Sequence, residues 1–239
     1  MTSPLVTAIA DGLLASGVDL ALVGRAWARA TPLVVIVPAF GLRALSVPTR
    51  VSMALGLAAV LFPALTVTAV GAPTGATFAL SVLVTEAFHG LPLAVATAVP
   101  LWAATMAGGL ADQLRGAQDT GTFVTLDGRT GPLSVLHGLA ASFAFFAMGG
   151  PARALRGLAR EPSGLGWQET ARVLSDGIGL SIALAAPVLA ASLIIEISAA
   201  LVARAAAPAH VDALLAPLKA ITFLVVVALG LSRVVALFP

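Results

Sequence analysis

The sequence predicts an all-α integral membrane protein, and three observations lead to that fold class. Hydrophobic residues make up 59% of the 239 residues, and charged residues make up only 10%. A soluble domain carries about 25% charged residues. The apolar residues lie in long runs, of the roughly 20-residue length that crosses a bilayer, and nowhere alternate with polar ones as in a strand. Each element is therefore expected to be a helix.

About six apolar segments follow one another along the chain, separated by charged residues or turns. The first contains Arg25 and Arg29 and is an imperfect span. Prolines inside the segments should kink or break the helices: Pro38, Pro63, Pro92, Pro100 and Pro187. The segments are expected at residues 20–41, from 51 to the turn sequence GAPTG at 71–75, from there to about 107, and at 132–150, 177–202 and 213–237. Residues 1–20 do not resemble a signal peptide, because they lack a basic n-region and because Asp11 and Asp19 interrupt the apolar stretch.

Two polar regions, at 110–131 and 151–176, both carry arginine and are expected to be loops. Only one apolar segment separates them, so the positive-inside rule cannot place both in the cytoplasm. Either the rule is overridden, or the segment between them is not an ordinary span. The conflict argues against six simple crossings of the bilayer.

The composition argues against an enzyme and implies no cofactor or metal. Cysteine is absent, which excludes disulfides and cysteine-ligated metals. The three histidines, His89, His137 and His210, have no metal-type spacing, and no nucleophile or phosphate-loop motif is present. Basic residues are too sparse to indicate nucleic-acid binding.

Two carboxylates lie inside apolar segments. Glu86 shares a helix face with His89, and Glu196 lies in the middle of its segment. Such groups can mark a proton or ion pathway, which would make the chain a small proton- or ion-coupled transporter. We favour the alternative, in which each accepts a structural hydrogen bond from a neighbouring helix or subunit, because a transporter usually shows more such groups. Arg153, Arg156 and Arg160 form an i, i+3, i+7 stripe on one face of a helix, which indicates a solvated or lipid-headgroup face.

Several stretches resemble the FliR/SctT family, which comprises the flagellar biosynthesis protein FliR and its injectisome counterpart SctT. RATPLVVIVPAFGLRALSVPTRVSMALGLAAVLFP (29–63) resembles the family's opening, and TEAFHGLPLAVA (85–96) resembles its E-x-x-x-G region at Glu86 and Gly90, without the later glycine. MAGGLADQLRGA (106–117) is nearer to the injectisome branch, and TFVTLDGRTGPLSVL (122–136) is similar to the loop that follows. Residues 183–208 and HVDALLAPLK (210–219) resemble the fifth helix and the turn after it.

The resemblance implies a subunit of the type III secretion export apparatus in the bacterial inner membrane. Residues 1–175 would resemble a P-type subunit and residues 176–239 a Q-type helical hairpin. Together with P-type (SctR/FliP-like) and Q-type (SctS/FliQ-like) subunits, and with the switch-type (SctU/FlhB-like) subunit, the chain would form a channel for unfolded substrates. Glu86, Glu196, Arg204 and Lys219 would be polar contacts between helices or subunits.

The resemblance also implies that the region of about 110–131 is a plug inside the channel. Its glycines, Gly116, Gly121 and Gly128, make the backbone permissive, and Phe123 and Val124 would exclude water from the closed pore. Asp112 and Arg115 lie three residues apart on the preceding helix end and would anchor the plug. Without the resemblance, a disordered loop is the alternative.

Overall fold

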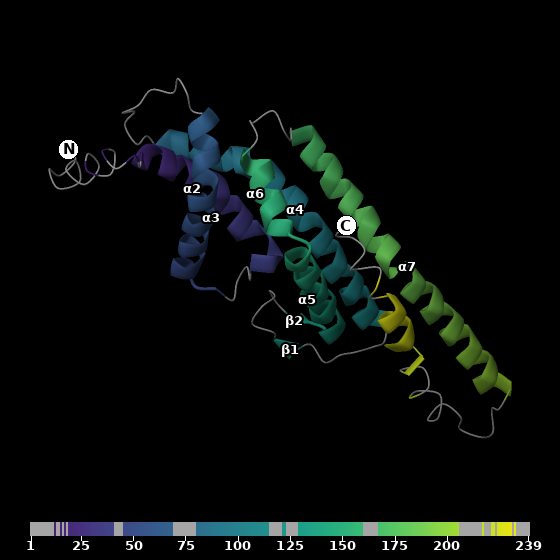
Figure 1. Cartoon of the computed structure of the whole chain (residues 1–239). Helices are drawn as coiled ribbons and strands as arrows, with labels where there is room; N and C mark the ends of the chain where they lie inside the picture. The colour runs from purple at the N-terminus through teal and green to yellow at the C-terminus, as the bar shows by residue number, and fades with distance from the viewer. Residues whose placement is uncertain are drawn as a thin grey trace. The chain divides into compact units, whose positions relative to one another are not determined.

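The computed structural model confirms an all-α membrane protein (Figure 1). Its helices are α2 (Leu20–Ile36), α3 (Val47–Thr68), α4 (Leu80–Leu114), α5 (Pro132–Ala147), α6 (Gly150–Ala159) and α7 (Trp167–Ala205), with a 3-10 turn, η1, at Pro38–Phe40. Two short strands, β1 (Gly121–Thr122) and β2 (Arg129–Thr130), pair antiparallel, with Gly121 opposite Thr130. The structure describes residues 12, 15, 17, 19–40, 45–68, 80–114, 121–122, 129–159, 167–205, 217, 221–222, 224–230 and 232.

Within these described residues, three helices are long and apolar enough to cross a membrane. They are the stretches Val47–Leu65, Leu80–Gln113 and Trp167–Ala205, and α5 with α6 would make a fourth if the bent pair is one span. Of the six expected helical segments, five coincide with α2, α3, α4, α5 and α7. The segment at 20–41 forms α2, which has only 17 residues and carries two arginines, and the one expected at 213–237 is described only in part.

The expected loop boundaries are wrong in two places. Helix α4 continues past Ala107 to Leu114, and the region 151–176 holds most of α6 and the beginning of α7. The polar composition of 151–176 suggests a loop, but α6 is an amphipathic helix, as the spacing of Arg153 and Arg156 predicts. It buries Ala154 and Leu158 while its arginines are exposed, so a helix accommodates the charges.

The expected helix breaks at proline occur only at Pro38, where α2 has ended and η1 begins. Helices α3 and α7 continue through Pro63 and Pro187, and α4 continues through Pro92 and Pro100. Proline inside a helix removes one backbone hydrogen bond, and membrane proteins tolerate this loss when neighbouring groups compensate for it.

Helix α5 bears on the conflict between the two arginine-bearing regions. It has 16 residues, or about 24 Å of helix, whereas the apolar core of a bilayer is about 30 Å thick. A turn at Met148 and Gly149 ends it, and Gly149 adopts a φ of +71°, which glycine reaches without steric cost. By length, the segment between the two regions is thus no ordinary span. This favours the explanation that the segment does not cross the bilayer in the usual way over the explanation that the positive-inside rule is overridden.

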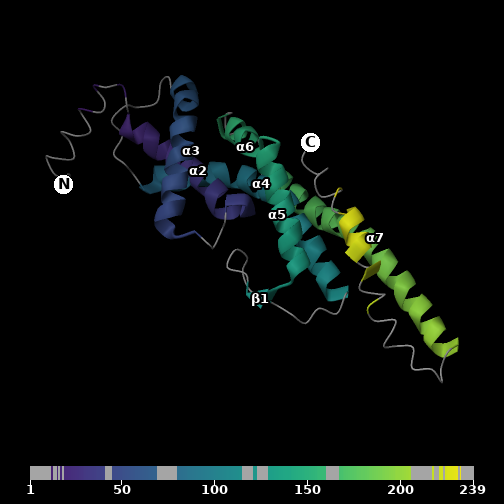
Figure 2. The same cartoon turned by 60° about the horizontal axis from the view of Figure 1, so that its bottom comes forward.

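The chain divides into two compact units. Unit 1 comprises Met1–Thr97 and Pro151–Ala171, and therefore holds α2, α3, the first half of α4, α6 after Gly150 and the start of α7. Helices α2 and α3 pack against each other, as both views show (Figures 1 and 2). The buried apolar side chains of this unit are mostly small or β-branched and include Ala26, Ala30, Leu33, Val34, Val37, Ala58 and Leu61.

Unit 2 comprises Ala98–Gly150 and Arg172–Pro239. The second half of α4 belongs to this unit and lies beside α5. A buried cluster in unit 2 consists of Ala111, Leu133, Val188 and Val227. This cluster joins α4, α5 and α7 to the helical residues 224–230. The proposed division at residue 175 into P-type-like and Q-type-like parts stays a prediction.

Candidate functional site: a buried arginine–glutamate cluster

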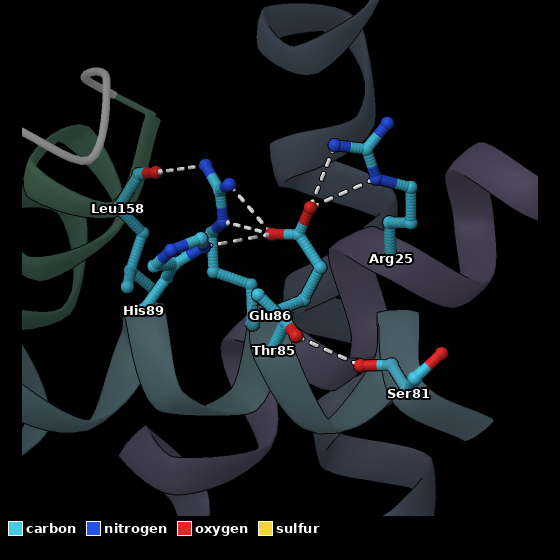
Figure 3. A network of polar contacts seen from close by, with 7 residues as sticks. Arg25, Ser81, Thr85, Glu86, His89 and Leu158 are labelled. Atoms are coloured by element: carbon cyan, nitrogen blue, oxygen red, sulfur yellow. Dashed lines mark hydrogen bonds and ion pairs between the residues drawn. The ribbon is translucent and has the colours of Figure 1, made fainter. Parts of the chain in front are cut away.

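Glu86 lies near the start of α4 and holds two arginines of α2. Its Oε1 accepts a hydrogen bond from Arg25 Nε at 2.8 Å and lies 2.7 Å from Arg25 Nη2. Its Oε2 accepts from Arg29 Nε at 2.8 Å and from Arg29 Nη2 at 2.6 Å (Figure 3). The Glu86 side chain is only 5% exposed, and that of Arg29 only 9%. Each carboxylate oxygen therefore serves one guanidinium group.

Sequence spacing explains why these three side chains meet. Arg25 and Arg29 are four residues apart on α2, so they project from the same face. Glu86 and Gly90 are likewise four apart on α4. A Cβ atom at Gly90 would overlap the backbone carbonyl of Arg29. Glycine at position 90 thus lets the two helix backbones approach closely enough for Glu86 to reach both arginines.

Helix α6 contributes a third element to the cluster. Arg29 Nη1 donates to the backbone carbonyl of Leu158 at 3.4 Å, and Leu158 is buried. A Cβ at Gly157 would lie 2.8 Å from Leu93 Cδ2, so α6 also packs tightly on α4. The Leu158 carbonyl is in the last turn of α6, where carbonyls lack partners within the helix. Arg29 consequently ties together α2, α4 and α6.

His89 completes the group. Its Nδ1 lies 3.8 Å from Glu86 Oε2, and its side chain is 39% exposed. The structure thus brings Glu86 and His89 together, as their spacing predicted, but the stronger partners of Glu86 are Arg25 and Arg29. Sequence reasoning missed these two as partners. The available signal was their own spacing of four residues inside an apolar segment, which marks a pair that needs a counter-charge.

The other residues predicted from sequence lie elsewhere. Glu196 and Arg204 are exposed on α7 in unit 2, and Lys219 lies outside the described residues. Glu196 therefore belongs to a different unit from Glu86 and His89. Among the described residues, no three His, Asp or Glu side chains gather as a metal-binding group.

The structure describes the predicted plug region at residues 110–114, 121–122 and 129–131. Asp112 is 4% exposed, and its Oδ2 accepts a hydrogen bond from the backbone N–H of Ser134 at 2.9 Å. Gly131 precedes α5, and a Cβ there would overlap the Asp112 carboxylate. Asp112 therefore holds the end of α4 to the beginning of α5. Gly121 lies in β1, whereas Arg115, Gly116, Phe123, Val124 and Gly128 lie outside the described residues.

A family model described as bacterial export proteins, family 1, matches residues 20–239, from the first residue of α2 to the end of the chain. The chain belongs to this family. The match confirms the FliR/SctT resemblance, and it includes every member of the Arg25–Arg29–Glu86 cluster. A comparison with curated proteins gives no match. As a bacterial export protein, the chain is a membrane component of a protein-export apparatus rather than a member of a known enzyme family.

Proposed function

We propose that this bacterial export protein is a structural and gating subunit of a type III secretion export apparatus. With P-type and Q-type subunits it would form the inner-membrane channel for unfolded substrates. The family match over residues 20–239 carries this proposal. The stretch DQLRGA at 112–117 favours the injectisome branch over the flagellar one.

Large apolar side chains lie on the outside of the helices, where lipid or partner subunits would contact them. On α5, Leu139 is 58% and Phe143 is 75% exposed. On α7, Ile182, Leu193 and Leu201 are 55%, 62% and 63% exposed. Faces of this kind need lipid or another protein to cover them.

The alternative of a proton- or ion-coupled transporter draws less support from the geometry. Its mechanism requires carboxylates that can exchange their partners. Glu86 instead has both oxygens engaged by two permanently charged guanidinium groups. A structural role, holding α2 to α4, fits this arrangement better.

The assembly proposal predicts that the protein made alone is degraded or aggregates. Co-production with P-type and Q-type subunits should raise its membrane level several-fold, because apolar faces and polar helix contacts are then covered by protein. The measurement is the amount of tagged protein in washed membranes, followed by co-purification. Co-production with an unrelated multi-pass membrane protein is the control. A monodisperse protein that is equally abundant with and without the partners would contradict the proposal.

The plug proposal predicts that deleting residues 118–129 leaves the complex assembled but makes the membrane leaky. Asp112 and Gly131, which hold α4 to α5, are retained in this deletion, so the helix contact should persist. Leakage is measured as ion or small-molecule influx into cells that carry the complete apparatus. The matched control replaces residues 118–129 by a loop of equal length that keeps Phe123 and Val124. If the deletion assembles and the membrane stays as tight as with the intact protein, this region is not the plug.

A further inference from the structure

Helix α5 begins without a capping side chain of its own. The residue at its N-cap is Gly131, which has no side chain that could accept a hydrogen bond. Serine, threonine, aspartate and asparagine are preferred at an N-cap, because their side-chain oxygen accepts from a backbone N–H in the first turn. Leu133 and Ser134 in this turn are buried, so water is a poor substitute for such an oxygen. The first turn of α5 therefore needs an acceptor from elsewhere in the protein.

Helix α4 supplies that acceptor. The first residue of α5 is a proline, which has no N–H, and the N–H of Val135 donates to the carbonyl of Gly131 at 3.2 Å. Among the first four helical residues, only Leu133 and Ser134 are left with an N–H that has no acceptor inside the helix. The Ser134 N–H donates to Asp112 Oδ2 at 2.9 Å. A carboxylate 22 residues earlier in the chain thus takes the hydrogen bond that an N-cap side chain would take.

Gly131 leaves the space that this carboxylate occupies. Its φ of −71° and ψ of 159° are extended backbone that any residue adopts, so the backbone conformation does not require glycine there. A Cβ atom at Gly131 would overlap the Asp112 carboxylate and lie 2.6 Å from the Asp112 Cβ. The buried Asp112 side chain thus fills the space that a side chain at position 131 would fill. Glycine at one position and aspartate at the other are complementary.

One face of α4 holds the carboxylate in this place. Thr105, Gly108 and Asp112 follow one another at spacings of three and four residues, so they share a helix face. The Thr105 carbonyl accepts a hydrogen bond from the Ser134 hydroxyl at 3.0 Å. Gly108 leaves room for the carbonyl of Leu133, which would lie 2.5 Å from a Cβ at that position. The first turn of α5 is therefore fixed against α4 at three successive positions, all within unit 2.

We propose that Asp112 is the N-cap residue of α5, supplied in trans by α4. Its carboxylate accepts from the third residue of α5, as an N-cap side chain does, and a negative charge is favourable at the N-terminus of a helix. One side chain thereby both starts α5 and joins it to α4, which explains why position 131 is left to glycine. This role goes beyond the export function and does not depend on it, because it rests on contacts within unit 2 alone.

The test moves the capping carboxylate from α4 to α5. Asp112→Ala removes the cap and should lower the midpoint of heat-induced aggregation of the full chain by about 2–6 °C. Gly131→Asp alone should also lower the midpoint, because the new side chain overlaps Asp112. In the Asp112→Ala chain the same Gly131→Asp substitution should raise the midpoint by about 1–4 °C, because the cap is restored in cis. The effect of one substitution thus changes sign between the two backgrounds.

Gly131→Ala in the Asp112→Ala chain is the matched control, because it fills the same space without an acceptor and should not raise the midpoint. Hydrogen exchange of the backbone amides at 131–137 is the second measurement. Exchange there should be faster in Asp112→Ala and slower again after Gly131→Asp, but not after Gly131→Ala. If Asp112→Ala does not accumulate in membranes, recovery of its level by Gly131→Asp and not by Gly131→Ala is the expected result.

Three results would overturn the proposal. The first is an Asp112→Ala chain with the midpoint and the amide exchange of the unsubstituted protein. The second is a Gly131→Asp substitution that lowers the midpoint, or the membrane level, equally in both backgrounds. The third is a rescue of Asp112→Ala by Gly131→Ala as complete as the rescue by Gly131→Asp, which would assign the contact to packing and not to capping. None of these results bears on whether the chain acts in export.

Discussion

Replacing Glu86 by alanine should destabilise unit 1 by about 3–5 kcal/mol, the usual cost of removing one partner of a buried ion pair. The effect should be large because one carboxylate compensates two arginines, of which Arg29 is only 9% exposed. Loss of Glu86 leaves both guanidinium groups without a counter-charge and removes the link between α2 and α4. The measurement is the midpoint of heat-induced aggregation of the tagged protein in detergent extracts.

Glu169→Ala is the matched control for this variant. Glu169 is an exposed carboxylate in the first turn of α7, and its removal should cost only about 0.3–1 kcal/mol. The double variant Glu86→Ala/Arg25→Gln should be more stable than Glu86→Ala alone, because one of the two uncompensated charges is gone. Equal midpoints for Glu86→Ala and Glu169→Ala would show that the cluster does not hold the helices together.

Replacing Gly108 by alanine should destabilise unit 2 by about 1–3 kcal/mol, as overpacking does in a tight interface. A Cβ atom at this position would lie 2.5 Å from the carbonyl oxygen of Leu133 and 2.7 Å from the Cα of Ser134. Both are backbone atoms, so no side chain can turn aside. Helices α4 and α5 would have to separate, which would weaken the hydrogen bond from Ser134 N–H to Asp112 and the one from the Ser134 hydroxyl to the Thr105 carbonyl.

Gly109→Ala offers a matched control in the neighbouring residue of the same helix. A Cβ at Gly109 would meet only the Ser134 hydroxyl oxygen, at 3.9 Å, which is an ordinary contact. Alanine is the better helix former by up to about 1 kcal/mol, so this variant should be neutral or slightly stabilising. The measurement compares the midpoints of heat-induced aggregation of the two variants, each produced together with the P-type and Q-type subunits. The close packing of α4 on α5 would be disproved if Gly108→Ala behaved like Gly109→Ala.

The composition, together with the stretches that resemble the FliR/SctT family, was sufficient to predict the broad class of this protein. An apolar content of 59% with 10% charge indicates a membrane protein whatever the packing, because the bilayer requires it. The FliR/SctT resemblance from stretches such as 85–96 and 106–117 agrees with a family match over residues 20–239. The existence of the long helices was predictable from their apolar runs. The boundaries of α6 were not predictable, because the composition of a short amphipathic helix with arginines is similar to that of a polar loop.

Only the tertiary structure decided what the intramembrane charges contact. The sequence indicated that Glu86 needs a partner, but Arg25 and Arg29 lie 61 and 57 residues away along the chain. Their meeting depends on the close approach of α2 and α4 at Gly90, which is a property of two helices together. Asp112 shows the same dependence, because its partner Ser134 lies 22 residues further on and is reached only through the contact of α4 with α5. Local patterns determine which residues are apolar or charged, whereas pairing between distant charges is determined by how closely the helix backbones can pack.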